Sequence, residues 1–162
     1  MKIKLFENTS DYTVIIGCGR LGANIANTLS DEESNVLIID KDKSSFRKLS
    51  PSYGGLMITG DGTDFDVLSD AQIEKATAVV VVTNNDNINV MIAQIAKEIF
   101  NVNHVIARLY DHEREFIYKE FNIDTICPAI LSANEINKFL LRSSTKNEKS
   151  NHNKISMQKG VI

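Results

Sequence analysis

The feature that most constrains this chain is a glycine triplet between an apolar strand and a helix. The residues Tyr12 to Gly22 read Tyr-Thr-Val-Ile-Ile-Gly-Cys-Gly-Arg-Leu-Gly, and the run 13–16 is typical of a parallel strand buried on both faces. Gly17, Gly19 and Gly22 follow in the GxGxxG spacing. The first permits a tight turn, the second lets a phosphate approach the backbone, and the third lets the helix lie close to its strand. The pattern predicts a phosphate-binding βαβ unit.

The residues that follow the glycine triplet in the sequence complete this βαβ unit. Apolar residues recur at helical spacing, at Leu21, Ile25, Ala26 and Leu29, so the positive end of a helix would face a phosphate. A second strand, 36–39, ends in Asp40, where a carboxylate accepts hydrogen bonds from both ribose hydroxyls. The fork of the Arg20 guanidinium suits a phosphate, although a solvated surface arginine remains the alternative. Cys18 is expected to be a small residue in a tight turn.

Strands and helices continue to alternate along the chain. Further strands are expected at 56–59, 78–82, 105–107 and 125–127. Helices are expected at 43–49, 65–71, about 88–99, 113–121 and 130–141, with Met91 and Ile99 among the inward residues of the third of these. The alternation predicts an α/β fold, a Rossmann-like, doubly wound, parallel six-stranded sheet in a single domain over 12–142. An N-terminal arm (1–11) precedes it and a polar, disordered tail (143–162) follows.

Two polar loops follow the expected third and fourth strands, on the rim where open parallel sheets bind ligands. In the first loop, Gly60 and Asp61 are candidates, and we expect Asp61 to contact the adenine or ribose edge. The alternative is that Asp61 only shapes the turn, while Thr63 or Asp64 caps the next helix. The second loop is expected to close the other side of the nucleotide crevice, with an N-cap role for Asp86 as the alternative. Its candidates are Thr83, Asn84, Asn85 and Asp86.

Length and composition narrow the function. A chain of 162 residues suffices for one domain, not for a Rossmann domain with a separate substrate domain. Two distant cysteines, Cys18 and Cys127, predict free thiols in the cytoplasm. No stretch reaches the apolar length of a membrane span, and the N-terminus does not resemble a signal peptide. The tail holds four lysines and one glutamate, which leaves 14 basic and 20 acidic residues elsewhere; this balance argues against nucleic-acid binding.

Five motifs in order resemble a known family. They are Gly-Cys-Gly-Arg-Leu-Gly, Ile-Ile-Asp-Lys-Asp, Gly-Asp-Gly-Thr-Asp, Val-Thr-Asn-Asn-Asp-Asn-Ile-Asn and Val-Ile-Ala-Arg. Over about 12–142 the chain resembles the N-terminal RCK (KTN, TrkA-N) domain of TrkA/KtrA potassium-transport proteins. The resemblance implies a domain that binds NAD(H) or an adenine nucleotide (ATP, ADP or AMP) and forms homodimers or higher homo-oligomers. It also implies a regulatory subunit at the cytoplasmic face of a membrane potassium channel or transporter.

The resemblance assigns roles by motif. It implies phosphate contacts from the glycine loop, a ribose contact from Asp40, and an Arg108 that faces the nucleotide or a neighbouring subunit. The nucleotide-binding set is therefore Gly17, Cys18, Gly19, Arg20, Leu21, Gly22, Asp40, Lys41, Gly60, Asp61, Thr83, Asn84, Asn85, Asp86 and Arg108. Complete members continue into a second regulatory domain where this chain has a polar tail. Some relatives also have an acidic residue after the proline that ends strand six, whereas Ala129 follows Pro128 here, so no metal role is transferred.

Two alternatives remain open: a small NAD-dependent oxidoreductase, and a stand-alone nucleotide-binding module. The sequence contains no recognisable acid–base set, because His104, His112 and His152 are scattered and no tyrosine–lysine pair has helical spacing. We therefore predict no catalytic residue. We predict a homodimer through the last two helices, because the apolar residues of the final one cover more than one stripe; a helix packed only on its own domain is the alternative. Those residues are Ile130, Leu131, Ile136, Phe139, Leu140 and Leu141.

Overall fold

The computed structural model describes residues 12–141. The expected arm (1–11) and tail (143–162) lie outside the described residues. The chain divides after Ile126 into two units. The first unit holds a sheet with its covering helices, and the second holds a helix over 128–141.

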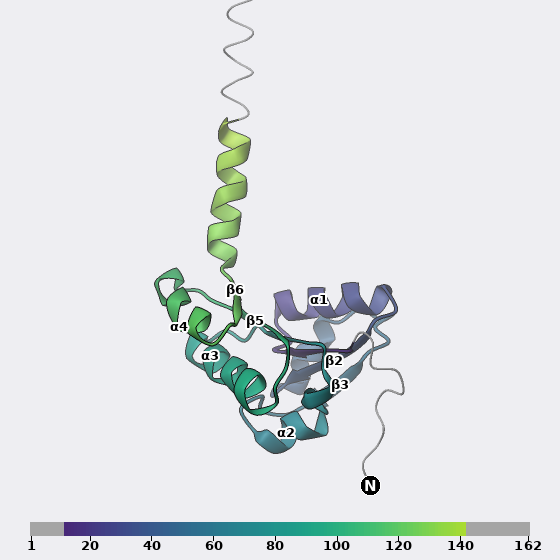
Figure 1. Ribbon diagram of the computed structural model, residues 1–162. Coiled ribbons are helices and arrows are strands. Elements are labelled where there is room, and N and C mark those ends of the chain that lie inside the picture. The colour runs from purple at the N-terminus through teal and green to yellow at the C-terminus, as the bar shows by residue number, and fades with distance from the viewer. Residues whose placement is uncertain (1–11, 142–162) are drawn as a thin grey trace, which may run out of the picture. The chain divides into compact units, whose positions relative to one another are not determined.

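The first unit is built on six parallel strands (Figure 1). Their order is β3-β2-β1-β4-β5-β6, so the chain starts in the middle, winds to one edge and then crosses to the other. This order confirms the predicted doubly wound Rossmann-like sheet and places its topological switch point between β1 and β4. The strands are β1 (Tyr12–Ile16), β2 (Asn35–Asp40), β3 (Leu56–Thr59), β4 (Ala78–Val81), β5 (His104–Arg108) and β6 (Asp124–Ile126).

Helices cover both faces of this sheet, α1 on one side and α2 with α3 on the other (Figure 1). Alternate residues of each central strand point to opposite faces, so Ile15 packs with Ala26 of α1 while Val14 packs with Ile92 of α3. Two apolar cores therefore flank β1, as its β-branched run predicts. The helical elements of this unit are α1 (Arg20–Asp31), η1 (Lys43–Lys48), α2 (Phe65–Asp70), η2 (Ile73–Lys75), α3 (Asp86–Gln94), η3 (Ile95–Ile99), η4 (His112–Arg114) and α4 (Glu115–Glu120).

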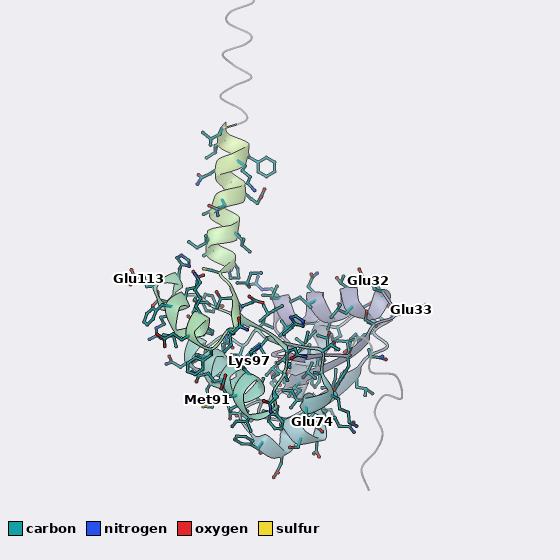
Figure 2. All side chains as sticks on the ribbon, viewed as in Figure 1. Glu32, Glu33, Glu74, Met91, Lys97 and Glu113 are labelled. Carbon is teal, nitrogen blue, oxygen red and sulfur yellow. The ribbon has the colours of Figure 1, made fainter. Side chains whose placement is uncertain are left out.

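The segment predicted as a helix over about 88–99 forms α3 and the π-helix η3, and its inward face differs from the predicted one. Met91 and Ile99 are 43% and 55% exposed, and Met91 points away from the sheet (Figure 2). Asn89 is fully buried instead. The physical reason is that the Asn89 amide bonds to Thr83 and Arg108 at the ends of β4 and β5, which turns residues 89, 92, 93 and 96 toward the sheet.

Two other segments depart from expectation in smaller ways. The segment predicted as a helix at 43–49 forms the 3₁₀ helix η1, which Asp42 caps by accepting a hydrogen bond from the Ser44 N–H at 2.8 Å. In the second unit, the helix begins at Pro128 and not at residue 130. Proline suits a first helical position because the N–H that it lacks would have no partner within the helix there. No helix within residues 12–141 is long and apolar enough to cross a membrane.

Candidate functional site

A cleft of about 330 Å³ lies in the first unit, where the carboxyl ends of β1 to β5 meet. Its volume lies within the range of small-molecule sites, and its position spans the switch point between β1 and β4. Several of the predicted residues line it together, from the carboxyl ends of five strands and the loops that follow them. These are Gly17, Gly19, Asp40, Lys41, Gly60, Asp61, Thr83, Asn84 and Arg108.

Two glycines of the triplet are required by the fold itself. Gly17 has a φ of +105°, which L side chains rarely adopt, and its N–H donates to the Ile39 carbonyl at 2.8 Å. Gly22 lies so close to this turn that a Cβ there would be 1.9 Å from the Gly17 oxygen. Both predicted roles, the tight turn and the close packing of α1, are confirmed.

Gly19 differs from Gly17 and Gly22, because the fold gives no steric reason for a glycine at this position. A Cβ at this position would meet no atom within 4 Å, and the backbone is extended. Gly19 is the N-cap of α1, where no side chain among the described residues caps the helix and no acidic residue lies in the first turn. At the other end stand Glu32 and Glu33 (Figure 2). The positive end of α1 therefore opens onto the cleft with no side-chain cap and no acidic residue of its own first turn, as suits an anion site.

Asp40 anchors the glycine loop and lines the cleft at once. One carboxylate oxygen accepts the Cys18 N–H at 2.7 Å and the other accepts the Asp42 N–H at 2.8 Å. A carboxylate has about four acceptor sites, so each oxygen retains capacity for a ribose hydroxyl. Cys18 itself contributes through its backbone, because its thiol is buried and donates to the Ser45 carbonyl at 3.4 Å. Burial raises the pKa of this thiol to about 11, so it is neutral at pH 7.

Asp61 shapes its loop and also lines the cleft. Its carboxylate accepts the Thr63 N–H at 2.9 Å and the Thr63 hydroxyl at 2.8 Å. These hydrogen bonds lower the pKa of Asp61 and keep it anionic at neutral pH. The cap of α2 is Asp64, which accepts the Asp66 N–H at 2.9 Å. The turn role and the position in the cleft therefore coexist.

A polar cluster around the buried Asn89 holds the far side of the cleft. Its side-chain oxygen accepts from the Thr83 N–H at 3.0 Å and the Thr83 hydroxyl at 2.6 Å. Its amide nitrogen donates to the carbonyls of Thr83 and Arg108 at 3.2 and 2.9 Å, and the Arg108 guanidinium also donates to the Thr83 carbonyl. The ends of β4 and β5 are thus tied together. Sequence reasoning missed Asn89, although a polar residue in an apolar helix face was a usable signal.

The remaining predicted residues lie outside the cleft lining. Asn85 is the N-cap of α3 and accepts the Asn87 and Ile88 N–H groups at 2.9 and 3.2 Å. The Asp86 carboxylate accepts the Tyr110 and Asp111 N–H groups, so it positions the loop after β5. The others are Cys18, Arg20, Leu21 and Gly22: Arg20 is exposed beside the loop, and Leu21 packs on the core under α1. Direct contact of these side chains with a nucleotide stays a prediction.

The structure adds lining residues that sequence reasoning did not identify. Ile88 and Ile92 supply an apolar wall, and Tyr110 supplies an aromatic ring that is 56% exposed. Tyr110 follows the end of β5 by two residues. Ligands bind at this rim of an open parallel sheet, so its position was a usable signal for a lining residue. Asp42, Ser45 and Gly62 also line the cleft.

The cleft offers charged and polar groups together with an apolar wall. No histidine lines it among the described residues, and His152 lies outside them. Residues 12–141 also contain no group of three or more His, Cys, Asp or Glu side chains that could hold a metal ion. An open helix N-terminus, a ribose-type carboxylate and an apolar wall together suit a phosphorylated nucleoside.

Comparison with known proteins identifies the family. The model of the TrkA-N domain family matches residues 13–128, a range that includes the glycine loop, Asp40 and Arg108. The chain belongs to the TrkA-N domain family. The Trk system potassium uptake protein TrkA of Streptomyces coelicolor is 39% identical over 135 residues, covering 83% of this chain and 60% of that protein. The TrkA homolog of Methanothermobacter thermautotrophicus is 30% identical over 132 residues, covering 81% and 61%.

This TrkA-N chain thus spans about 60% of the length of these curated relatives. Among solved structures, the GsuK channel bound to NAD has a TM-score of 0.71 at 23% identity, over 84% of this chain and 24% of that chain. The Kef C-terminal domain of Shewanella denitrificans in its AMP-bound form has a TM-score of 0.69 at 19% identity, over 92% and 97%. GsuK bound to ADP has a TM-score of 0.69 at 24% identity, over 82% and 34%. At these identities the structures support the fold.

Proposed function

We propose that this TrkA-N chain binds NAD(H) or an adenine nucleotide and acts as a regulatory subunit of a membrane potassium channel or transporter. The observation that carries the proposal is the cleft that brings Gly19, the open N-terminus of α1 and Asp40 together. The TrkA-N relatives are potassium uptake proteins, and similar folds have been solved with NAD, ADP and AMP. In this proposal the chain works in the cytoplasm and reaches the inner face of the membrane through its partner.

Each part of the nucleotide has a complementary group. The phosphates lie against Gly19 and the N–H groups of the first turn of α1, with Arg20 beside them. The ribose hydroxyls donate to Asp40, and the adenine lies toward Gly60 and Asp61. Thr83, Asn84 and Arg108 close the far side. Together these groups account for the phosphates, the ribose and the adenine of the ligand, which supports a binding role.

Purification without added ligand tests this function. We expect mass spectrometry of the denatured protein to find NAD, ATP, ADP or AMP, and calorimetry on ligand-stripped protein to give saturable binding of at least one of them. Absence of both signals would contradict the proposed function.

Asp40 should exclude NADP. A 2′-phosphate would lie against a carboxylate whose two oxygens are already fixed by the N–H groups of Cys18 and Asp42. We expect NADP to bind at least about tenfold more weakly than NAD, the equivalent of roughly 1.4 kcal/mol. Calorimetric titrations with NAD and with NADP give the two dissociation constants, whose ratio tests this prediction.

Lys41 provides the control for this prediction. It lines the cleft next to Asp40, and its positive charge offsets the negative charge of the Asp40 carboxylate. Lys41→Ala should widen the preference for NAD. Asp40→Ala should weaken NAD binding by about 1.5–3 kcal/mol, the value of hydrogen bonds to a charged group, and should narrow the preference, because it also removes the charge that repels the 2′-phosphate. Equal affinity of the wild type for NAD and NADP would contradict the assignment of Asp40 to the ribose hydroxyls.

A homodimer through the helix over 128–141 is part of the proposal. Ile130, Leu131 and Ile136 are 42%, 50% and 58% exposed, and apolar patches of this kind mark protein interfaces. We expect light scattering to report a dimer at concentrations well above micromolar. Ile136→Glu should produce monomers, while the same charge one residue along, in Asn137→Glu, should retain the dimer. A monomeric wild type would contradict this assembly.

A further inference from the structure

Tyr110 places an aromatic ring on the rim of the cleft opposite Asp40. Asp40 ends β2, whereas Tyr110 follows β5 by two residues, and β1 and β4 lie between these strands in the sheet. Both residues line the same cleft. With 56% of its surface exposed, Tyr110 offers a flat apolar surface to a ligand that reaches across the switch point.

The backbone under this ring is fixed. The two oxygens of the Asp86 carboxylate accept the Tyr110 N–H at 3.0 and 2.9 Å, and one of them accepts the Asp111 N–H at 3.0 Å. Leu109, one residue earlier, is fully buried. A ring carried by so constrained a segment loses little conformational freedom on binding.

Arg108 holds the ring from one side. The central carbon of its guanidinium lies 4.6 Å from the centroid of the Tyr110 ring, within the range of a cation–π contact. The guanidinium is itself tied to the Thr83 carbonyl and so to the cluster around Asn89. The aromatic surface is therefore preorganised through β4, α3 and β5 together.

The order of the binding groups determines what this ring would meet. In an open parallel sheet, a dinucleotide lies across the switch point, with its pyrophosphate at the glycine loop between its two halves. With adenosine at Asp40 and the pyrophosphate at Gly19, the second half of the ligand extends toward β4 and β5. AMP and ADP have no second half, so they would leave this rim empty.

We propose that Tyr110 stacks on the nicotinamide ring of NAD(H) and thereby makes the site select a dinucleotide over shorter adenine nucleotides. This assignment rests on the proposed nucleotide-binding function and adds a specificity determinant to it. Stacking of a base on an aromatic side chain is worth roughly 5- to 150-fold in affinity, enough to set the order of preference among ligands that share the same adenosine contacts.

ADP-ribose provides the matched ligand, because it differs from NAD only in lacking the nicotinamide. Calorimetry on Tyr110→Ala should show NAD binding about tenfold weaker, while ADP-ribose and AMP stay within about twofold of the wild type. Tyr110→Phe keeps the ring and should keep wild-type affinity for all three. An equal loss for NAD and ADP-ribose, or no loss for either, would overturn the stacking assignment.

A second measurement reports the contact directly. The chain contains no tryptophan, so Tyr110→Trp places a single tryptophan, which can be excited selectively over tyrosine, at the stacking position. Saturating NAD should quench its emission, and saturating ADP-ribose should not. Unchanged emission with bound NAD would again exclude stacking. Failure of the wild type to bind any of these ligands would overturn the proposed function instead, so the two failures are distinguishable.

Discussion

Gly22→Ala is expected to lower the free energy of unfolding by about 3 kcal/mol or more. The added Cβ would lie 1.9 Å from the Gly17 oxygen and 3.1 Å from its carbonyl carbon, and both are backbone atoms that no rotamer change can move. Relief requires α1 to shift off β1, which disturbs the core of Ile15, Ala23 and Ala26. Overpacking a well-filled core costs about 1–3 kcal/mol and occasionally more, and a rigid backbone clash belongs at the upper end.

Urea unfolding of the variant and the wild type measures this loss, with Gly54→Ala as the matched control. A Cβ at Gly54 would have its nearest neighbour, the Ser30 Oγ, at an ordinary 3.7 Å. Gly54→Ala should therefore stay within about 0.5 kcal/mol of the wild type. Equal unfolding midpoints and slopes for Gly22→Ala and the wild type would show that α1 does not pack this closely on the glycine loop.

The contrast between local and distant interactions explains which parts of this site the sequence predicts. The turn at Gly17 and the burial of the strand 12–16 follow from residues adjacent in the chain, so spacing and periodicity are sufficient. The cap of α2 by Asp64 is equally local, since its partner is two residues away. The order of the strands follows from the alternation of strand and helix, because parallel crossovers leave few topologies.

The far side of the cleft depends on partners that no local pattern reveals. Asp86 bonds to the N–H groups of Tyr110 and Asp111, more than twenty residues later. Asn89 reaches the Arg108 carbonyl across a similar separation, and this bond turns Met91 outward against the expected helical stripe. Such side chain–backbone bonds depend on how β4 and β5 sit side by side, which is decided by tertiary packing and not by propensity.

Gly19→Ala is expected to retain the fold and lose the nucleotide. The new Cβ would meet no protein atom within 4 Å, and the residue has a φ of −73° that alanine adopts without strain. The free energy of unfolding should therefore stay within about 0.5 kcal/mol of the wild type. The methyl group would occupy the space through which a phosphate approaches the N-terminus of α1.

The expected loss is about 1.5–3 kcal/mol of binding free energy, the value of a backbone hydrogen bond to a charged group, or roughly 10- to 150-fold in dissociation constant. Calorimetry with AMP, ADP-ribose and NAD should show a similar loss for all three, because all carry the phosphate next to the adenosine. The pattern differs from that of Tyr110→Ala, which weakens NAD alone. Wild-type affinity in Gly19→Ala, with an unchanged unfolding curve, would mean that the phosphate does not approach α1 at this glycine and that the anion lies elsewhere in the cleft.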